Sequence, residues 1–114
     1  MKQYDLVAIC AQECPRKFKT TRAAEIEEFM RDEGFATISS ELVDMWEMFI
    51  IVFVKINLYD QIGSVNTTKL AKGAMRQMIG NKGCIAYNFT FRDRHINIFA
   101  VHLRHGQNAS AERD

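Results

Sequence analysis

Two strand-like apolar segments of the sequence end in residues that could carry acid–base or metal chemistry. Glu13 follows the apolar run 6–11, and His102 lies near the end of the run 96–103. In layered α/β folds, ligand sites gather at the carboxyl ends of strands, so we expect this carboxylate and this imidazole to converge on one pocket. The alternative is that Glu13 only marks where a strand reaches water and that His102 is satisfied inside the core.

A third candidate is the segment Gly80-Asn81-Lys82-Gly83, which precedes another strand-like run. Glycines let the backbone approach a ligand closely, and a lysine among exposed amides suits phosphate. An ordinary polar turn has the same composition, so the segment alone leaves both interpretations open.

A zinc site is a fourth reading. Cys10 and Cys14 lie four residues apart, and His102 and His105 lie three apart. These spacings do not match the usual cysteine hook followed by a nearby histidine pair, which makes zinc the weaker hypothesis.

The elements that must position these residues are mostly strands. The continuous apolar run 6–11 predicts a central strand that is buried on both faces. We expect a hairpin near the end of the chain, whose charged turn is 92–95. The other predicted strands are 35–43, 48–56, a short strand and loop within 58–70, and the hairpin strands 84–91 and 96–103.

One amphipathic helix is predicted after Thr20 or Thr21, either of which could cap it, and Gly34 supplies its end. Its apolar residues recur at helical spacing: Ala23, Ile26, Phe29 and Met30. One helix among about six strands predicts an α/β (α+β) sheet protein.

Composition restricts the partners. The chain has 114 residues, of which 47% are hydrophobic, and 15 basic against 14 acidic residues give a formal charge of +1. Such a balance gives no broad field that marks either nucleic acid or a membrane as the partner, so any anion binding must be local. No apolar run approaches the roughly 20 residues of a membrane-spanning helix. Three cysteines without a regular framework favour a reducing compartment, so we expect a cytoplasmic protein.

Taken together and in order, these segments resemble the inositol polyphosphate 5-phosphatase domain, a branch of the DNase I-like endonuclease/exonuclease/phosphatase superfamily. The matching segments are 4–13 with its final Gln12-Glu13, 45–55 with Trp46, the Gly-Asn-Lys-Gly motif 80–83, Val101-His102-Leu103, and 106–113. The resemblance covers nearly the whole chain but only the first part of such a domain.

The resemblance implies a partial DNase I-like layered β-sandwich with flanking helices. It implies that Glu13 coordinates Mg²⁺, that His102 contacts the scissile phosphate, and that Glu13 and His102 are the catalytic residues. Asn81 and Lys82 would bind the inositol phosphates. The implied activity is Mg²⁺-dependent removal of the 5-phosphate from phosphoinositides or inositol polyphosphates, with peripheral membrane contact.

The resemblance also implies that residues 1–114 are an N-terminal portion of the catalytic domain, truncated at both ends. The sequence contains neither the family's Trp-x-Gly-Asp-x-Asn segment nor its Pro-x-Trp-Cys-Asp-Arg segment. We therefore expect little or no turnover by the chain alone, and an uncovered sheet face that limits its solubility. Two alternatives stay open: another DNase I-like phosphodiesterase or endonuclease, and a non-catalytic β-rich interaction module.

Overall fold

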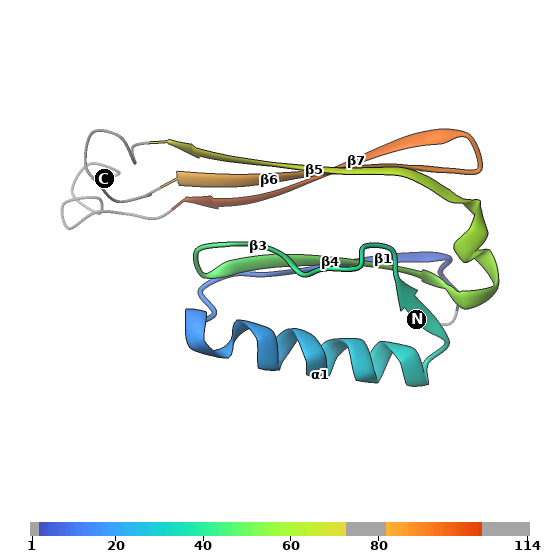
Figure 1. The fold of residues 1–114 in the computed structure, drawn as a ribbon, viewed down its shortest axis with the longest axis horizontal. Helices are drawn as coiled ribbons and strands as arrows, with labels where there is room; N and C mark the ends of the chain where they lie inside the picture. The colour runs from blue at the N-terminus through green and yellow to red at the C-terminus, as the bar shows by residue number, and fades with distance from the viewer. Residues whose placement is uncertain (1–2, 73–81, 104–114) are drawn as a thin grey trace.

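A computed structural model describes residues 3–72 and 82–103, with the backbone only at Lys72, Lys82 and Leu103. The elements in chain order are β1 (Leu6–Ala11), the 3₁₀ turn η1 (Arg16–Phe18), α1 (Lys19–Asp32), β2 (Phe35–Thr37), β3 (Val43–Met45), β4 (Met48–Lys55), the 3₁₀ turn η2 (Ile56–Gln61), β5 (Ile62–Lys72), β6 (Lys82–Phe91) and β7 (Arg94–Leu103). Figure 1 shows three layers, with α1 on one face of the sheet containing β4 and the sheet of β5, β6 and β7 on the other.

Strand β4 is the centre of the first sheet. It pairs antiparallel with β1 along one edge and with β2 and β3 along the other. Every residue from Met48 to Val54 is buried, because both faces of the strand are covered. The apolar strand that is buried on both faces is therefore β4. The prediction that 6–11 is the central buried strand was wrong: β1 is an edge strand and its residues are partly exposed.

The alternation of side chains along β4 divides the core into two clusters. Met48, Ile50, Val52 and Val54 face the second sheet, where they pack with residues of β6 such as Ile85 and Tyr87. Phe49, Ile51 and Phe53 face α1 and pack against Ala23 and Met30. A single strand thus joins all three layers.

Helix α1 ends as predicted but begins differently. Gly34 has φ 91°, the left-handed conformation that glycine adopts readily, and its N–H bonds the carbonyl oxygen of Arg31 at 3.0 Å. The predicted cap at Thr20 or Thr21 was wrong, because the helix begins at Lys19 and Phe18 occupies the N-cap position without a side-chain hydrogen bond. Phe29, predicted on the buried face, is 55% exposed.

The second sheet consists of β5, β6 and β7 in that order, all antiparallel. The predicted hairpin is confirmed, with a turn shorter than expected: Arg92 and Asp93 have φ of 52° and 66°, the conformations of a two-residue turn that matches strand twist. Strand β5 is much longer than the short strand predicted within 58–70. The predicted strand 35–43 is divided into β2 and β3.

Within the described residues, no helix is long and apolar enough to cross a membrane.

Candidate active site

The end of β1 meets the end of β7 across the two sheets. The side-chain amide of Gln12 donates a hydrogen bond of 2.5 Å to the carbonyl oxygen of Val101. Gln12 immediately precedes Glu13, and Val101 immediately precedes His102. The two residues that the sequence singled out therefore follow the two partners of one hydrogen bond.

Glu13 is exposed and lies in a strained turn directly after β1. Its φ of 58° is left-handed, a conformation that costs a non-glycine residue about 1 kcal/mol or more. The next residue fixes the turn, because the N–H of Cys14 bonds the carbonyl oxygen of Glu47 at 2.9 Å. Trp46, which precedes Glu47, is also left-handed at φ 54°. Left-handed residues of this kind cluster at functional sites, where the surrounding fold holds them in place.

His102 is a nearly buried polar residue, 9% exposed, on the face of β7 that is turned toward the first sheet. In the register of β6 and β7 it lies opposite Gly83. Among the described residues no hydrogen bond of its imidazole occurs, and none of their buried side-chain nitrogen or oxygen atoms lacks a partner, so both interpretations of His102 stay open. An imidazole at a strand end without such a partner can bond a ligand instead.

The indole ring of Trp46 packs against Gly83 at this end of the site. A Cβ built on Gly83 would lie 2.8 Å from Cζ3 of the indole ring and 3.2 Å from the sulfur of Met45. Only glycine lets the ring pack on the β6 backbone at this distance. The tryptophan ring fills the space beside Gly83. This contact explains the glycine without a phosphate in the same place, as the sequence interpretation had assumed.

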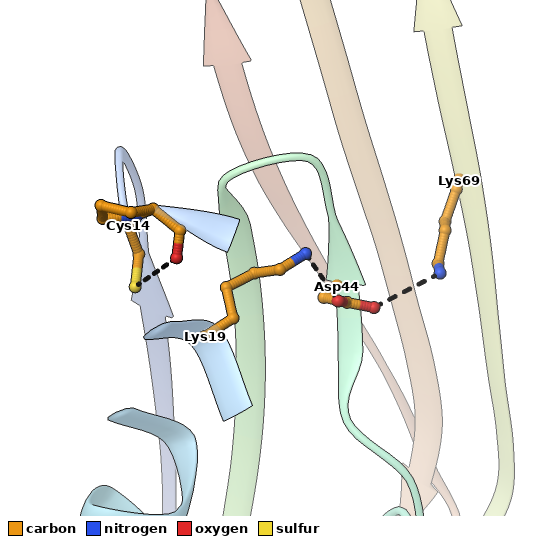
Figure 2. A network of polar contacts seen from close by, with 5 residues as sticks. Cys14, Lys19, Asp44 and Lys69 are labelled. Carbon is orange, nitrogen blue, oxygen red and sulfur yellow. Dashed lines mark hydrogen bonds and ion pairs between the residues drawn. The ribbon is translucent and has the colours of Figure 1, made fainter. Parts of the chain in front are cut away.

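Two ion pairs that share Asp44 of β3 connect α1 to both sheets near this end of the molecule. Asp44 forms ion pairs with Lys19 at 2.6 Å and with Lys69 at 3.8 Å, and Figure 2 shows it between the two ammonium groups. The Lys19 side chain is only 11% exposed, so this pair is screened less than an ordinary surface pair. The Sγ of Cys14 bonds the carbonyl oxygen of Pro15 at 3.9 Å beside it.

Burial raises the pKa of the Cys10 thiol, and a hydrogen bond with the Gln12 side chain lowers it by less. The thiol is therefore mostly protonated at neutral pH, and Cys10 is not an activated nucleophile. A groove of about 490 Å³ lies between residues 38–43 and β5, but neither Glu13 nor His102 lines it.

Comparison with known proteins now decides the family. The model of endonuclease/exonuclease/phosphatase family 2 matches residues 1–114. The chain belongs to this family. Its members hydrolyse phosphate esters, which agrees with the predicted hydrolase class. A search among curated proteins found no match.

The fold of this endonuclease/exonuclease/phosphatase chain is similar to a solved inositol polyphosphate 5-phosphatase domain. That domain, of SPsynaptojanin, was determined in complex with inositol (1,4)-bisphosphate and a calcium ion. The TM-score is 0.73 at 18% identity, over 96% of this chain and 34% of the other. The predicted fold class, a partial DNase I-like β-sandwich, is confirmed. The chain spans about a third of that structure.

The remaining predicted ligands fall partly outside the described residues. Asn81 and His105 lie there entirely, and for Lys82 only the backbone is described, paired with Leu103 at the start of β6. No group of three or more His, Cys, Asp or Glu side chains capable of holding a metal occurs among the described residues, so nothing in them supports the zinc reading. A single exposed carboxylate such as Glu13 does suit Mg²⁺, which keeps several waters and is often held by one or two carboxylates together with substrate phosphate.

Sequence reasoning missed two contacts of the site. It treated Gln12 only as part of a motif, although this residue makes the bond to β7. It named Trp46 only as part of the matching segment 45–55, although the ring packs on Gly83 from the turn between β3 and β4. A glutamine that directly follows an apolar strand was the available signal for the first contact; the second had none.

Proposed function

We propose that this chain carries part of the active site of a Mg²⁺-dependent phosphatase that removes the 5-phosphate from phosphoinositides or inositol polyphosphates. The observation that supports the proposal most is the hydrogen bond from Gln12 to Val101. It joins the end of β1, which Glu13 follows, to the end of β7, where His102 lies. A phosphate site shared by the two residues requires such a connection. The likeness to a domain determined with inositol (1,4)-bisphosphate supports the substrate class.

In this proposal Glu13 holds the Mg²⁺, because its carboxylate is exposed and offers hard oxygen ligands. The ion, when bound, neutralises charge on the phosphoryl oxygens and so lowers the barrier to attack by water. His102 donates a hydrogen bond to a phosphoryl oxygen from the edge of the core, where low solvent exposure strengthens that bond. Asn81 and Lys82 bind the other phosphates of the inositol ring.

The proposal is tested by titrating the chain with inositol 1,4,5-trisphosphate in the presence of Mg²⁺ while the histidine side-chain NMR resonances are followed. The His102 resonances should shift, and those of His95, at the turn where β7 begins, should not. Glu13→Gln and His102→Ala should each weaken binding about tenfold, because each removes a charge-assisted contact. Asp93→Asn, a matched carboxylate-to-amide change in the β6–β7 turn, is the control.

Two results would contradict this assignment. Equal weakening by Asp93→Asn and Glu13→Gln would mean that the ligand senses only net charge. Tighter binding of a dinucleotide than of the inositol phosphate through the same residues would assign the site to a nuclease. Phosphate release by the isolated chain should be slow, because it lacks the Trp-x-Gly-Asp-x-Asn segment.

A further inference from the structure

A cluster of basic side chains around one exposed aromatic ring follows the end of β1. Residues 16–22 include the four cations Arg16, Lys17, Lys19 and Arg22, and no acidic residue lies between Glu13 and Glu25. The whole chain has a formal charge of only +1, so this positive charge is local. We call Arg16, Lys17, Phe18 and Arg22 the basic surface; all four are exposed.

The ring of Phe18 lies in the middle of the basic surface. It is a large apolar side chain and is 43% exposed. The ammonium nitrogen of Lys17 is 5.1 Å from the ring centroid and the guanidinium carbon of Arg22 is 6.0 Å from it. An apolar ring held at the surface between cations combines the two properties that favour the interface of a lipid bilayer.

The basic surface is held in place by the fold. Lys19, in the middle of the segment, pairs with Asp44 at 2.6 Å, as Figure 2 shows, and its side chain is only 11% exposed. The N–H of Phe18 bonds the carbonyl oxygen of Pro15 at 2.8 Å. Arg22 pairs with Glu25 at 3.1 Å, but both side chains are 60% exposed, and such a surface pair is easily exchanged for another anion. Three cations are therefore exposed at this junction, Arg16 and Lys17 from η1 and Arg22 from the start of α1.

Helix stability does not explain this distribution of charge. The first turn of α1 contains no acidic residue and has no side-chain cap, while Glu27, Glu28 and Asp32 occupy its later turns. The helix dipole favours the reverse order, with acids at the start and bases at the end. Basic residues at this start thus oppose the stability of the isolated helix, and an anionic partner would remove the conflict.

We propose that the basic surface docks on an anionic lipid bilayer, with its three cations at the headgroups and Phe18 in the interface. A lipid surface fits better than nucleic acid, because the cluster places an exposed phenyl ring between its cations, as the interface of an anionic bilayer favours. Arg16 is three residues from Glu13, so docking would bring the site edge close to the membrane. The choice of a lipid surface rests on the proposed phosphoinositide phosphatase function.

The test is sedimentation of the full chain with phosphatidylcholine vesicles that do or do not contain phosphatidylserine, all lacking phosphoinositides. Binding should require phosphatidylserine and weaken as salt is added. The variant Arg16→Gln with Lys17→Gln should bind about 25-fold more weakly, at about fivefold for each cation removed. Arg31→Gln with Arg94→Gln, an equal charge change at two exposed positions outside the basic surface, should bind as the parent does. Phe18→Ala should weaken binding, and Phe18→Trp should preserve it.

Several outcomes would overturn the inference: equal losses in the two double variants, binding to vesicles without phosphatidylserine, or capture of a single-stranded oligonucleotide in preference to the vesicles. Circular dichroism of each variant shows whether a loss comes from unfolding, and Phe18→Trp keeps the test decisive if Phe18→Ala unfolds. Glu13→Gln should keep vesicle binding, because the vesicles contain no substrate. A failure of the phosphatase assignment is thereby distinguishable from a failure of membrane docking.

Discussion

Gln12 and Val101 are 89 residues apart in the sequence and are joined by a hydrogen bond of 2.5 Å between the side-chain amide of one and the backbone carbonyl of the other. This bond connects the edge strand β1 of the first sheet to β7 of the second. It makes the positions of Glu13 and His102 depend on one another, although the two residues belong to different sheets.

Replacing Gln12 should loosen this connection. Gln12→Leu removes the donor, and we expect the free energy of unfolding to fall by about 0.5–1.5 kcal/mol, toward the lower end because Gln12 is exposed. Urea denaturation measures that change, and the NMR resonances of His102 should shift with it. Gln12→Asn keeps the amide on a shorter side chain and should behave like Gln12→Leu; full stability of the Asn variant would show that reach does not matter.

The contact between Trp46 and Gly83 gives a second prediction. Gly83→Ala places a methyl group 2.8 Å from the indole, so we expect a loss of about 1–3 kcal/mol in the free energy of unfolding and a change in tryptophan fluorescence. Because the clash is with the ring, the loss should shrink in a Trp46→Leu background. An equal loss in both backgrounds would mean that the backbone, and not the ring, requires glycine at this position.

Tyr87 predicts a pH dependence of stability. Burial raises the pKa of its phenol, while its hydrogen bond with Ser39, 2.7 Å long, lowers it by less. Because the folded-state pKa is above the unfolded value of about 10, folding favours the protonated phenol. The resulting stability is complete below about pH 10 and is lost as the pH rises through the folded pKa.

Tyr87→Phe removes this alkaline loss. Its free energy of unfolding should depend less steeply on pH above about pH 10 than that of the parent. At neutral pH the variant should be about 1 kcal/mol less stable, because the bond to Ser39 is gone. Exposed Tyr4→Phe serves as the matched control. The account fails if both variants lose stability with pH at the parental rate.

The outer face of the second sheet gives a prediction about association. Leu70, Phe99 and Val101 are 61%, 63% and 47% exposed there, and an apolar sheet face of this kind promotes self-association. Phe99→Asn should reduce the concentration-dependent increase in sedimentation coefficient while stability changes by about 0.5 kcal/mol or less. Asn97→Ser, a polar exchange on the same face, should leave association as it was. If Phe99→Asn self-associates like the parent, another surface is responsible.

The sequence predicted those features that depend on local pattern. The run 48–54, the glycine that ends α1 and the β6–β7 hairpin follow from side-chain period and turn chemistry, and all are present. Local pattern cannot tell an edge strand from a central one, since both contain apolar residues; β1 was therefore misassigned. The helix start was missed because the 3₁₀ turn η1 runs directly into α1, where the backbone N–H of Lys19 bonds the carbonyl oxygen of Arg16 and no capping side chain is used.

The candidate site, too, was predicted from the sequence only in part. Glu13 and His102 were identifiable because titratable residues at the ends of apolar strands are unusual. That these two residues lie at the same end of the molecule depends on how the two sheets stack, and so does the packing of Trp46 on Gly83. No spacing within either strand contains that information.

The central claim is that Glu13 and His102 belong to one metal-phosphate site. Its most direct test is paramagnetic broadening of the histidine side-chain NMR resonances by Mn²⁺, which occupies oxygen sites like those of Mg²⁺. Mn²⁺ should broaden the resonances of His102 and leave those of His95, in the first residues of β7, sharp; Glu13→Gln should abolish the effect. Equal broadening of both histidines, or broadening of His102 that persists in Glu13→Gln, would contradict the claim.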